Sequence, residues 1–228
     1  MLAEKIYHGT YRARGQRMLA SNAFEESIGD RHWLGDGIYF FVEDFYAYKW
    51  IVDMYNKQYN ESCRDDALIE EYMIISAGQK ADARMFDLIK AAHKIEFDKT
   101  FAELKRKKEH IPRFRTVEIS DGVVINYMFN ELGYAQDFDL VRAIFGLNPR
   151  HYRSVFTRFG FMPQEQRCIK NPTVVEDADE YHYADNIAVY KDQIRDMYFN
   201  NVIQPPSANK VVKYSPTAGN PPFRMKRR

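Results

Sequence analysis

Three short segments of the chain carry side chains that could take part in chemistry. Residues 7–10 (YHGT) place a histidine before a glycine, at the end of a predicted strand. Residues 33–41 (WLGDGIYFF) lead through two glycines into an aromatic strand, and residues 164–172 (QEQRCIKNP) lead through polar residues into another strand. Each segment alone is typical of ordinary structure: a hydrogen-bonded histidine, a core strand, a solvated loop. Their types, order and spacing together indicate a site.

The elements that must position these segments form no regular alternation of strand and helix. β-Branched, aromatic and alternating apolar residues predict strands at 5–8, 37–41, 70–77, 140–145 and 166–170. Apolar residues at intervals of three and four predict helices at 12–21, 43–59, 86–109, 123–132 and 186–200. Neither GxGxxG nor GxxxxGK[ST] occurs, so the Rossmann and P-loop classes lose their main support. The sequence predicts one α+β domain over residues 1–203 and a separate tail over residues 204–228.

Composition excludes several classes of protein. The 228 residues include 33 Lys+Arg against 32 Asp+Glu, with 45% apolar and 15% aromatic residues, which excludes wholesale disorder. No apolar stretch is long enough to span a membrane, and the N-terminus has no signal-peptide core. Two cysteines and six scattered histidines give no metal-ligand spacing, so we expect no metal site. We expect a cytoplasmic protein.

Positive charge is concentrated in two segments. Residues 204–228 contain six basic residues, no acidic residue and five of the nine prolines. This composition predicts an extended tail that is either solubilising or a contact for phosphates or a partner. Residues 105–115 (KRKKEHIPRFR) form the second basic run, which Pro112 ends. That run is either a solvated face or a nucleic-acid contact.

The three chemical segments together resemble the ADP-ribosyltransferase superfamily, in the branch of diphtheria toxin and the poly(ADP-ribose) polymerases with its His–Tyr–Glu signature. Residues 33–50 look like the second sequence block of small bacterial members. Asp87-Leu88, residues 141–145 (VRAIF) and residues 166–172 match the landmarks that follow. The resemblance implies a split, mixed β-sheet with peripheral helices and a cleft for NAD, which is consumed with release of nicotinamide.

The resemblance assigns roles that the side chains can perform. His8 offers a ring nitrogen to a ribose hydroxyl, and Thr10 could add a hydroxyl. Gly9 lets its backbone approach the nicotinamide carboxamide. Tyr39 provides a stacking face worth ~0.5–1.5 kcal/mol beyond burial, and Trp50 is the family's position for the second face. Gly37 keeps the approach to the Tyr39 strand narrow. We expect the imidazole of His8 and the phenol of Tyr39 to line one cleft.

The third signature position departs from the family, because Gln166 stands where a glutamate is expected. A glutamine can bond the 2′-hydroxyl of the nicotinamide ribose but cannot act as a general base. Glu165 is adjacent, but neighbouring strand residues face opposite sides, so both cannot point at the ribose. Gln164 occupies the position of a target-recognising side chain. We prefer Gln166 on the ribose, with Glu165 or Gln164 toward the acceptor.

The segment before the last predicted strand favours a nucleic acid slightly over a protein as the acceptor. Arg153, Arg158 and Phe159 belong to an aromatic and basic stretch that could stack on bases and pair with phosphates. A loop folded on its own aromatic cluster explains the same residues equally well.

The leading hypothesis is therefore an NAD-dependent mono-ADP-ribosyltransferase, a toxin or phage-defence effector with a neutralising antitoxin as its partner. An NAD glycohydrolase and an RNA 2′-phosphotransferase are alternatives within the same fold, although GIYFF fits the latter poorly. A catalytically silent interaction module is the alternative from another class, and Gln166 favours it.

Overall fold

The structure is a computed structural model that describes residues 3–29, 32–60, 63–145 and 164–195. These residues form a single α+β domain around one mixed sheet with the strand order β4-β5-β6-β2-β1-β3-β7. Neighbouring strands are antiparallel except for β4 and β5, which run parallel. The strands are β1 (Glu4–Tyr11), β2 (Ile38–Phe41), β3 (Tyr72–Gln79), β4 (Met85–Asp87), β5 (Leu140–Phe145), β6 (Gln164–Ile169) and β7 (Val175–Tyr181).

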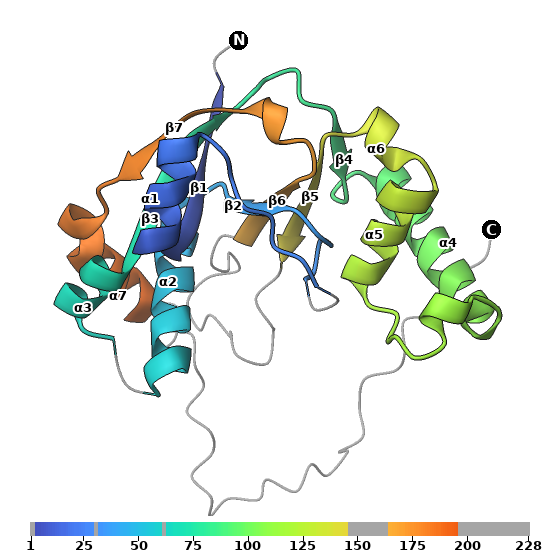
Figure 1. Cartoon of the computed structure of the whole chain (residues 1–228), viewed down its shortest axis with the longest axis horizontal. Coiled ribbons are helices and arrows are strands. Elements are labelled where there is room, and N and C mark those ends of the chain that lie inside the picture. Colours follow the sequence, from blue (N-terminus) through green and yellow to red (C-terminus); the bar gives the residue numbers. More distant parts are fainter. Residues whose placement is uncertain (1–2, 30–31, 61–62, 146–163, 196–228) are drawn as a thin grey trace, which may run out of the picture.

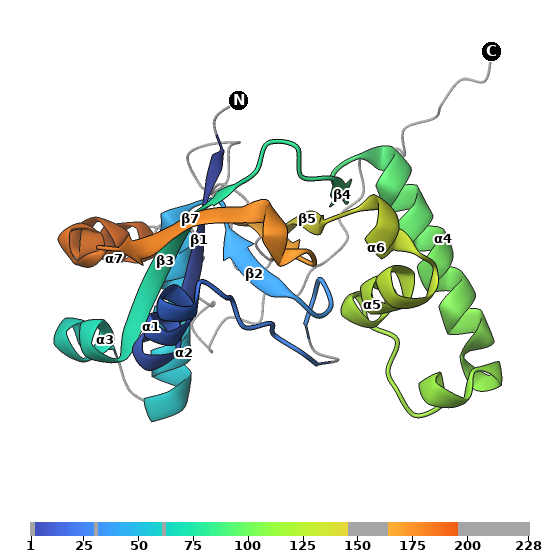
Figure 2. The same ribbon diagram turned by 45° about the horizontal axis from the view of Figure 1, so that its top comes forward.

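Helices gather at both ends of this sheet (Figures 1 and 2). One group lies with β1, β3 and β7, and the other lies with β4 and β5, on the far side of the central strands β2 and β6. The first group is α1 (Arg12–Ser21), α2 (Asp44–Tyr59), α3 (Asp65–Glu71) and α7 (Ile187–Arg195); the second is α4 (Ala91–Lys107), α5 (Asp121–Glu131) and α6 (Tyr134–Asp137). Short 3₁₀ helices occur at η1 (Lys108–His110), η2 (Pro112–Phe114), η3 (Pro172–Val174) and η4 (Ala184–Asn186).

Local sequence explains several helix ends. Ser120 caps α5 by accepting a hydrogen bond from the backbone N–H of Val123. The residues after α1 and α2 are Asn22 and Asn60, both in the left-handed conformation that asparagine tolerates. Pro112 starts η2 shortly after the end of α4.

The two faces of the sheet are covered differently. On one face, Tyr72 and Ile74 of β3 pack with α2, while Val141 and Cys168 pack with α4 and α5. On the other face, Met18 of α1 packs against β3, and a second cluster of strand residues packs against Phe24. The face toward α2 and α5 thus carries two apolar clusters, one at each end of the sheet.

The centre of the sheet is weakly joined. The pairing of β1 with β2 consists of one residue pair, Tyr7 with Phe41, whereas β1 pairs with β3 over eight residue pairs. Beyond Tyr7 the ladder between β1 and β2 does not continue. The sheet is therefore divided into two halves that meet at one point.

The predicted mixed α+β domain is confirmed, and the helix at 12–21 and the strand at 140–145 have the predicted bounds. The helix predicted over 86–109 is wrong at its start, because residues 85–87 pair with β5 as β4 and the helix begins at Ala91. The elements α3, α6 and β7 were not predicted. Positions 196–200 of the last predicted helix and the tail at 204–228 lie outside the described residues.

No helix within the described ranges is both long enough and apolar enough to cross a lipid bilayer.

Candidate functional site

The three segments identified in the sequence lie on neighbouring strands. His8, Tyr39 and Gln166 belong to β1, β2 and β6, which are adjacent in the order β6-β2-β1. Gln166 pairs with Phe41, which in turn pairs with Tyr7 beside His8. The fold therefore brings together residues that are 158 positions apart in the chain (166 − 8).

His8 lies where β1 and β2 separate. Its Nδ1 is 2.7 Å from the backbone oxygen of Tyr39, and because a carbonyl only accepts, Nδ1 carries the hydrogen. The other ring nitrogen, Nε2, is buried and has no hydrogen-bond partner in the part of the chain that the structure describes. Burial lowers the pKa of His8 to about 4, although the bond to Tyr39 opposes this shift. The imidazole is therefore neutral at pH 7 and presents Nε2 as an unused acceptor.

Tyr39 is fixed through its hydroxyl. The hydroxyl donates to the backbone oxygen of Gly35 at 2.6 Å and accepts from the backbone N–H of Leu34 at 3.0 Å. Burial is the main reason why the pKa of this phenol is raised far above its usual value, so the hydroxyl stays protonated. The ring is half-buried and lies 5.7 Å from the ring of His32. The hydroxyl is thus committed to the loop before β2, and the ring face is what remains for a ligand.

Two further side chains hold the same loop, and neither was predicted. The ammonium group of Lys170 donates to the backbone oxygens of Leu34 and Asp36. The side-chain oxygen of Asn126 on α5 accepts from the backbone N–H of Asp36 at 2.7 Å. Burial lowers the pKa of Lys170. Lys170 lies within the third segment, but nothing in that segment indicates its role, and Asn126 belongs to none of the three segments; both roles are defined only by contacts across the fold.

Gly37 and Gly9 are required by close packing. A Cβ atom on Gly37, where φ is +148°, would lie 2.6 Å from the backbone oxygen of Ile169. A Cβ on Gly9 would lie 2.9 to 3.0 Å from atoms of Ile51, Ala47 and Trp50 on α2. These two glycines let β6 and α2 approach. The same contact brings the half-buried Trp50 next to Gly9, on the face of the sheet that also carries Tyr39.

The three polar residues at the start of β6 separate by face. Gln166 is opposite Phe41 and Ala143, so it shares the face of Tyr39, and Gln164 lies two residues away on that face. Glu165 points to the other face, where it accepts hydrogen bonds from Arg142 at 2.7 and 2.8 Å. Arg167 donates to the same carboxylate at 3.0 Å. Burial opposes ionisation of Glu165, but these bonds prevail and lower its pKa.

Glu165 is therefore an ion-pair partner on the face away from Tyr39. Its neighbour Arg167 is 2% exposed and also bonds Gln79 and Glu4. If Glu165 turned away, Arg142 would keep only Asp87 as a carboxylate partner among the described residues, and the fully buried Arg167 would keep only the exposed Glu4. Losing the central carboxylate of such a buried network is costly. The structure thus does not bring Glu165 together with Tyr39, and it leaves Gln166 as the polar side chain nearest the predicted third position.

Two sequence-based expectations need correction. Thr10 is 2% exposed and lies against Gly15 of α1, so its hydroxyl is not open to a ligand. The rings of His8 and Tyr39 do not line one surface, because His8 packs on Phe40, and Phe40 and Tyr39 point to opposite faces. What the two residues share is the end of the β1–β2 pairing, where Nδ1 of His8 bonds the backbone oxygen of Tyr39. Arg153, Arg158 and Phe159 lie outside the described residues.

Comparison with known proteins gives a relationship but no activity. The chain is 38% identical over 191 residues to Uncharacterized protein MJ0359 of the archaeon Methanocaldococcus jannaschii. The match covers 77% of this chain and 86% of that protein. The chain belongs to the same family. No protein-family model and no solved structure matches it.

Proposed function

We propose that this protein is an NAD-dependent ADP-ribosyltransferase with an ADP-ribosyltransferase-like fold, which passes ADP-ribose from NAD to a macromolecule and releases nicotinamide. The observation that carries the proposal is the state of His8. A neutral imidazole, held by Tyr39 through Nδ1–H, keeps a buried Nε2 without a partner in the described part of the chain. Buried polar atoms normally have a hydrogen-bond partner. A buried acceptor without one, at the end of the β1–β2 pairing, therefore points to a donor that a ligand supplies. A ribose hydroxyl is such a donor, and to reach the buried Nε2 it must displace Phe24, whose ring lies 5.9 Å from that of His8.

The remaining residues supply what the rest of the dinucleotide needs. NAD binds where the pairing of β1 with β2 ends, with a ribose hydroxyl on Nε2 of His8. The nicotinamide lies on the opposite face, against the rings of Tyr39 and Trp50. A fixed hydroxyl leaves the ring of Tyr39 rigid, which reduces the entropy lost on stacking. Gln166 on the same face accepts a hydrogen bond from the nicotinamide ribose through its amide oxygen.

The reaction breaks one bond and forms one. The bond between C1′ of the ribose and the pyridinium nitrogen breaks, and nicotinamide leaves with the electron pair as a neutral molecule. The ribose carbon passes through an oxocarbenium-like state, as in glycoside cleavage. An oxygen or nitrogen of the acceptor then bonds to C1′ and its proton passes to solvent. Gln166 orients the ribose but takes no proton, so we expect slow turnover compared with a carboxylate at this position.

A catalytically silent module of the same fold is the second candidate. The observation that favours it is the ion-pair network around Glu165, which removes the adjacent carboxylate from the Tyr39 face and leaves only an amide there. Such a module would still bind NAD.

The test is release of nicotinamide from NAD by the purified protein. The wild type should release nicotinamide, Gln166→Ala should release much less, and Gln136→Ala, the same change at an exposed position on α6, should match the wild type. NAD binding without release would establish the silent module, whereas a wild type that neither binds nor cleaves NAD would overturn both candidates. Transfer of labelled ADP-ribose to RNA, DNA or lysate protein then identifies the acceptor.

A further inference from the structure

A strongly basic surface surrounds the end of α4. Residues 105–115 contain six Lys and Arg side chains and one glutamate, and they form the last turn of α4, η1 and η2. Lys107 and Arg113 pair with Glu103 and Glu131. Within the described ranges the other four basic side chains form no salt bridge; they are Lys105, Arg106, Lys108 and Arg115.

The C-terminus of α4 accounts for only some of these positive charges. A helix C-terminus favours positive charge within its last turn, by about 0.3–1 kcal/mol per group. Lys105 and Arg106 fall in that turn, but Arg115 comes after it, as does Arg113, which already pairs with Glu131. Cations gathered beyond the helix end repel one another, and an anionic partner would relieve that repulsion.

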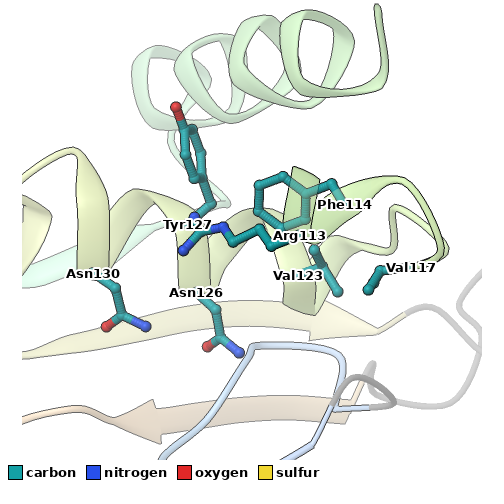
Figure 3. Close-up of a pocket in the computed structure, with 7 residues that line it drawn as sticks. All are labelled: Arg113, Phe114, Val117, Val123, Asn126, Tyr127 and Asn130. Carbon is teal, nitrogen blue, oxygen red and sulfur yellow. The ribbon is translucent and has the colours of Figure 1, made fainter. Parts of the chain in front are cut away.

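A pocket adjoins the cluster at η2. It has a volume of about 220 Å³ and lies between η2 and one face of α5 (Figure 3). The side chains that line it are Arg113, Phe114, Val117, Val123, Asn126, Tyr127 and Asn130. The guanidinium carbon of Arg113 is 4.4 Å from the ring centre of Phe114 and 5.6 Å from that of Tyr127. Arg113 thus belongs to both the basic cluster and the pocket.

Besides the guanidinium group of Arg113 and the hydroxyl of Tyr127, two amide side chains line the pocket. Asn126 uses its side-chain oxygen to accept from Asp36, which leaves its NH₂ group as a donor. Asn130 is exposed, and its amide forms no hydrogen bond within the described part of the chain. Amides beside an aromatic and a guanidinium plane are the groups that bind the edge and the face of an unpaired base.

We propose that this surface binds single-stranded nucleic acid, with backbone phosphates on the basic cluster and one base in the pocket. The pocket is smaller than a drug-sized site and suits a single planar ring system. Base pairing would hide the edge that the amides face, so the ligand is single-stranded. An acidic peptide or a lipid headgroup would use the charges but neither the rings nor the amides.

This site does not depend on NAD chemistry, because a catalytically silent chain would carry it too. It is nevertheless coupled to the candidate site. Asn126 lines the pocket and bonds Asp36, which belongs to the loop that anchors Tyr39. If both proposals hold, a strand bound here lies beside the Tyr39 loop and is positioned as the acceptor.

Binding of fluorescent twelve-nucleotide RNA and DNA, measured by anisotropy at several salt concentrations, tests the proposal. We expect K105E/R106E/K108E to lower the affinity by about tenfold or more and to reduce the magnitude of the logarithmic salt slope by about 2, since single strands give about 0.7 per phosphate contact. K5E/K57E/K90E makes the same charge change at exposed lysines outside α4 and should leave both quantities unchanged.

A second variant tests the pocket. Tyr127→Leu keeps the apolar packing but removes the ring, and should weaken binding about 5- to 100-fold without changing the salt slope. Three results would overturn the proposal: no binding of single strands at about 50 mM salt, equal losses in the two charge-reversal variants, or preferential binding to duplexes. Binding to phosphatidylserine vesicles without binding to oligonucleotides would replace the nucleic acid by a membrane surface. Because both charge-reversal variants change only surface lysines and arginines, they remain informative if Tyr127→Leu does not fold.

Discussion

Nδ1 of His8 donates a hydrogen bond of 2.7 Å to the backbone oxygen of Tyr39, just beyond the last residue pair that joins β1 to β2. A side chain therefore takes over the link between the two halves of the sheet where the backbone ladder stops. The bond fixes the tautomer of the imidazole and leaves Nε2 as an acceptor. This one hydrogen bond thus links β1 to β2 and also determines that the other ring nitrogen of His8 is a hydrogen-bond acceptor.

Titration of His8 should make the fold less stable in mild acid. Its pKa is about 4 in the folded protein and 6.5 in the unfolded chain, so the unfolded state binds the extra proton between these values. Stability is therefore complete above pH 6.5 and falls as the pH drops toward 4, by about 2 kcal/mol between pH 7 and pH 5. Urea unfolding at the two pH values measures this change.

The control is His8→Asn, whose amide nitrogen lies as far along the side chain as Nδ1 and can keep the bond to Tyr39 without titrating. This variant should lose about 2 kcal/mol of the pH dependence. An equal pH dependence in the variant and the wild type would show that other groups cause it.

Tyr39 should separate into a structural hydroxyl and a ligand-binding ring. Tyr39→Phe removes the bonds to Gly35 and Leu34 and should lower the free energy of unfolding by about 1–3 kcal/mol, while the Michaelis constant for NAD changes little. Tyr39→Ala removes the ring as well and should raise that constant by roughly 2- to 10-fold more. If both variants give the wild-type constant, Tyr39 is only a core residue.

Lys170 should act as a positioning residue for the Tyr39 loop. Lys170→Met keeps most of the side-chain volume but leaves the backbone oxygens of Leu34 and Asp36 without their donor, at a cost of about 1–3 kcal/mol. The loop should become more exposed to hydrogen exchange, and the Michaelis constant for NAD should rise more than kcat falls. Unchanged exchange in residues 34–36 would contradict this role.

Gln166 and Glu165 should give opposite results although they are neighbours. Gln166→Ala should reduce nicotinamide release with little change in melting temperature. Glu165→Gln should lower the melting temperature, because it takes an anionic partner from Arg142 and Arg167, and should leave turnover of the folded protein unchanged. A stable Glu165→Gln protein without activity would return the third catalytic role to Glu165.

The sequence predicted the elements whose residues have a strong local pattern. The apolar and aromatic residues of β2 and β5 indicate buried strands, and α1 follows directly from a strand end. The polar sequence of β7 (VEDADEY) carries no such pattern, because it lies at the edge of the sheet and is half-exposed. Residues 85–87 form a strand only through pairing with β5, which no local signal reveals.

The sequence predicted which strands carry the candidate site, but it did not predict the directions in which all of their side chains point. Strand alternation correctly separated Glu165 from Gln166, since it needs only their order. It could not place the imidazole of His8 relative to the phenol of Tyr39, because the register of β1 with β2 and the end of their ladder are tertiary properties. Lys170 and Asn126 escaped prediction for the same reason: each acts on backbone atoms far away in the sequence.

The most direct test of the account is the response of His8 to NAD, measured by NMR on protein labelled with ¹⁵N in its histidines. NAD should shift the Nε2 resonance of His8 as this lone pair accepts a ribose hydroxyl, while Nδ1 stays protonated and bonded to Tyr39. His8→Asn identifies the resonance by its loss. If saturating NAD leaves Nε2 of His8 unchanged, no dinucleotide binds at this nitrogen, and the proposed function is wrong.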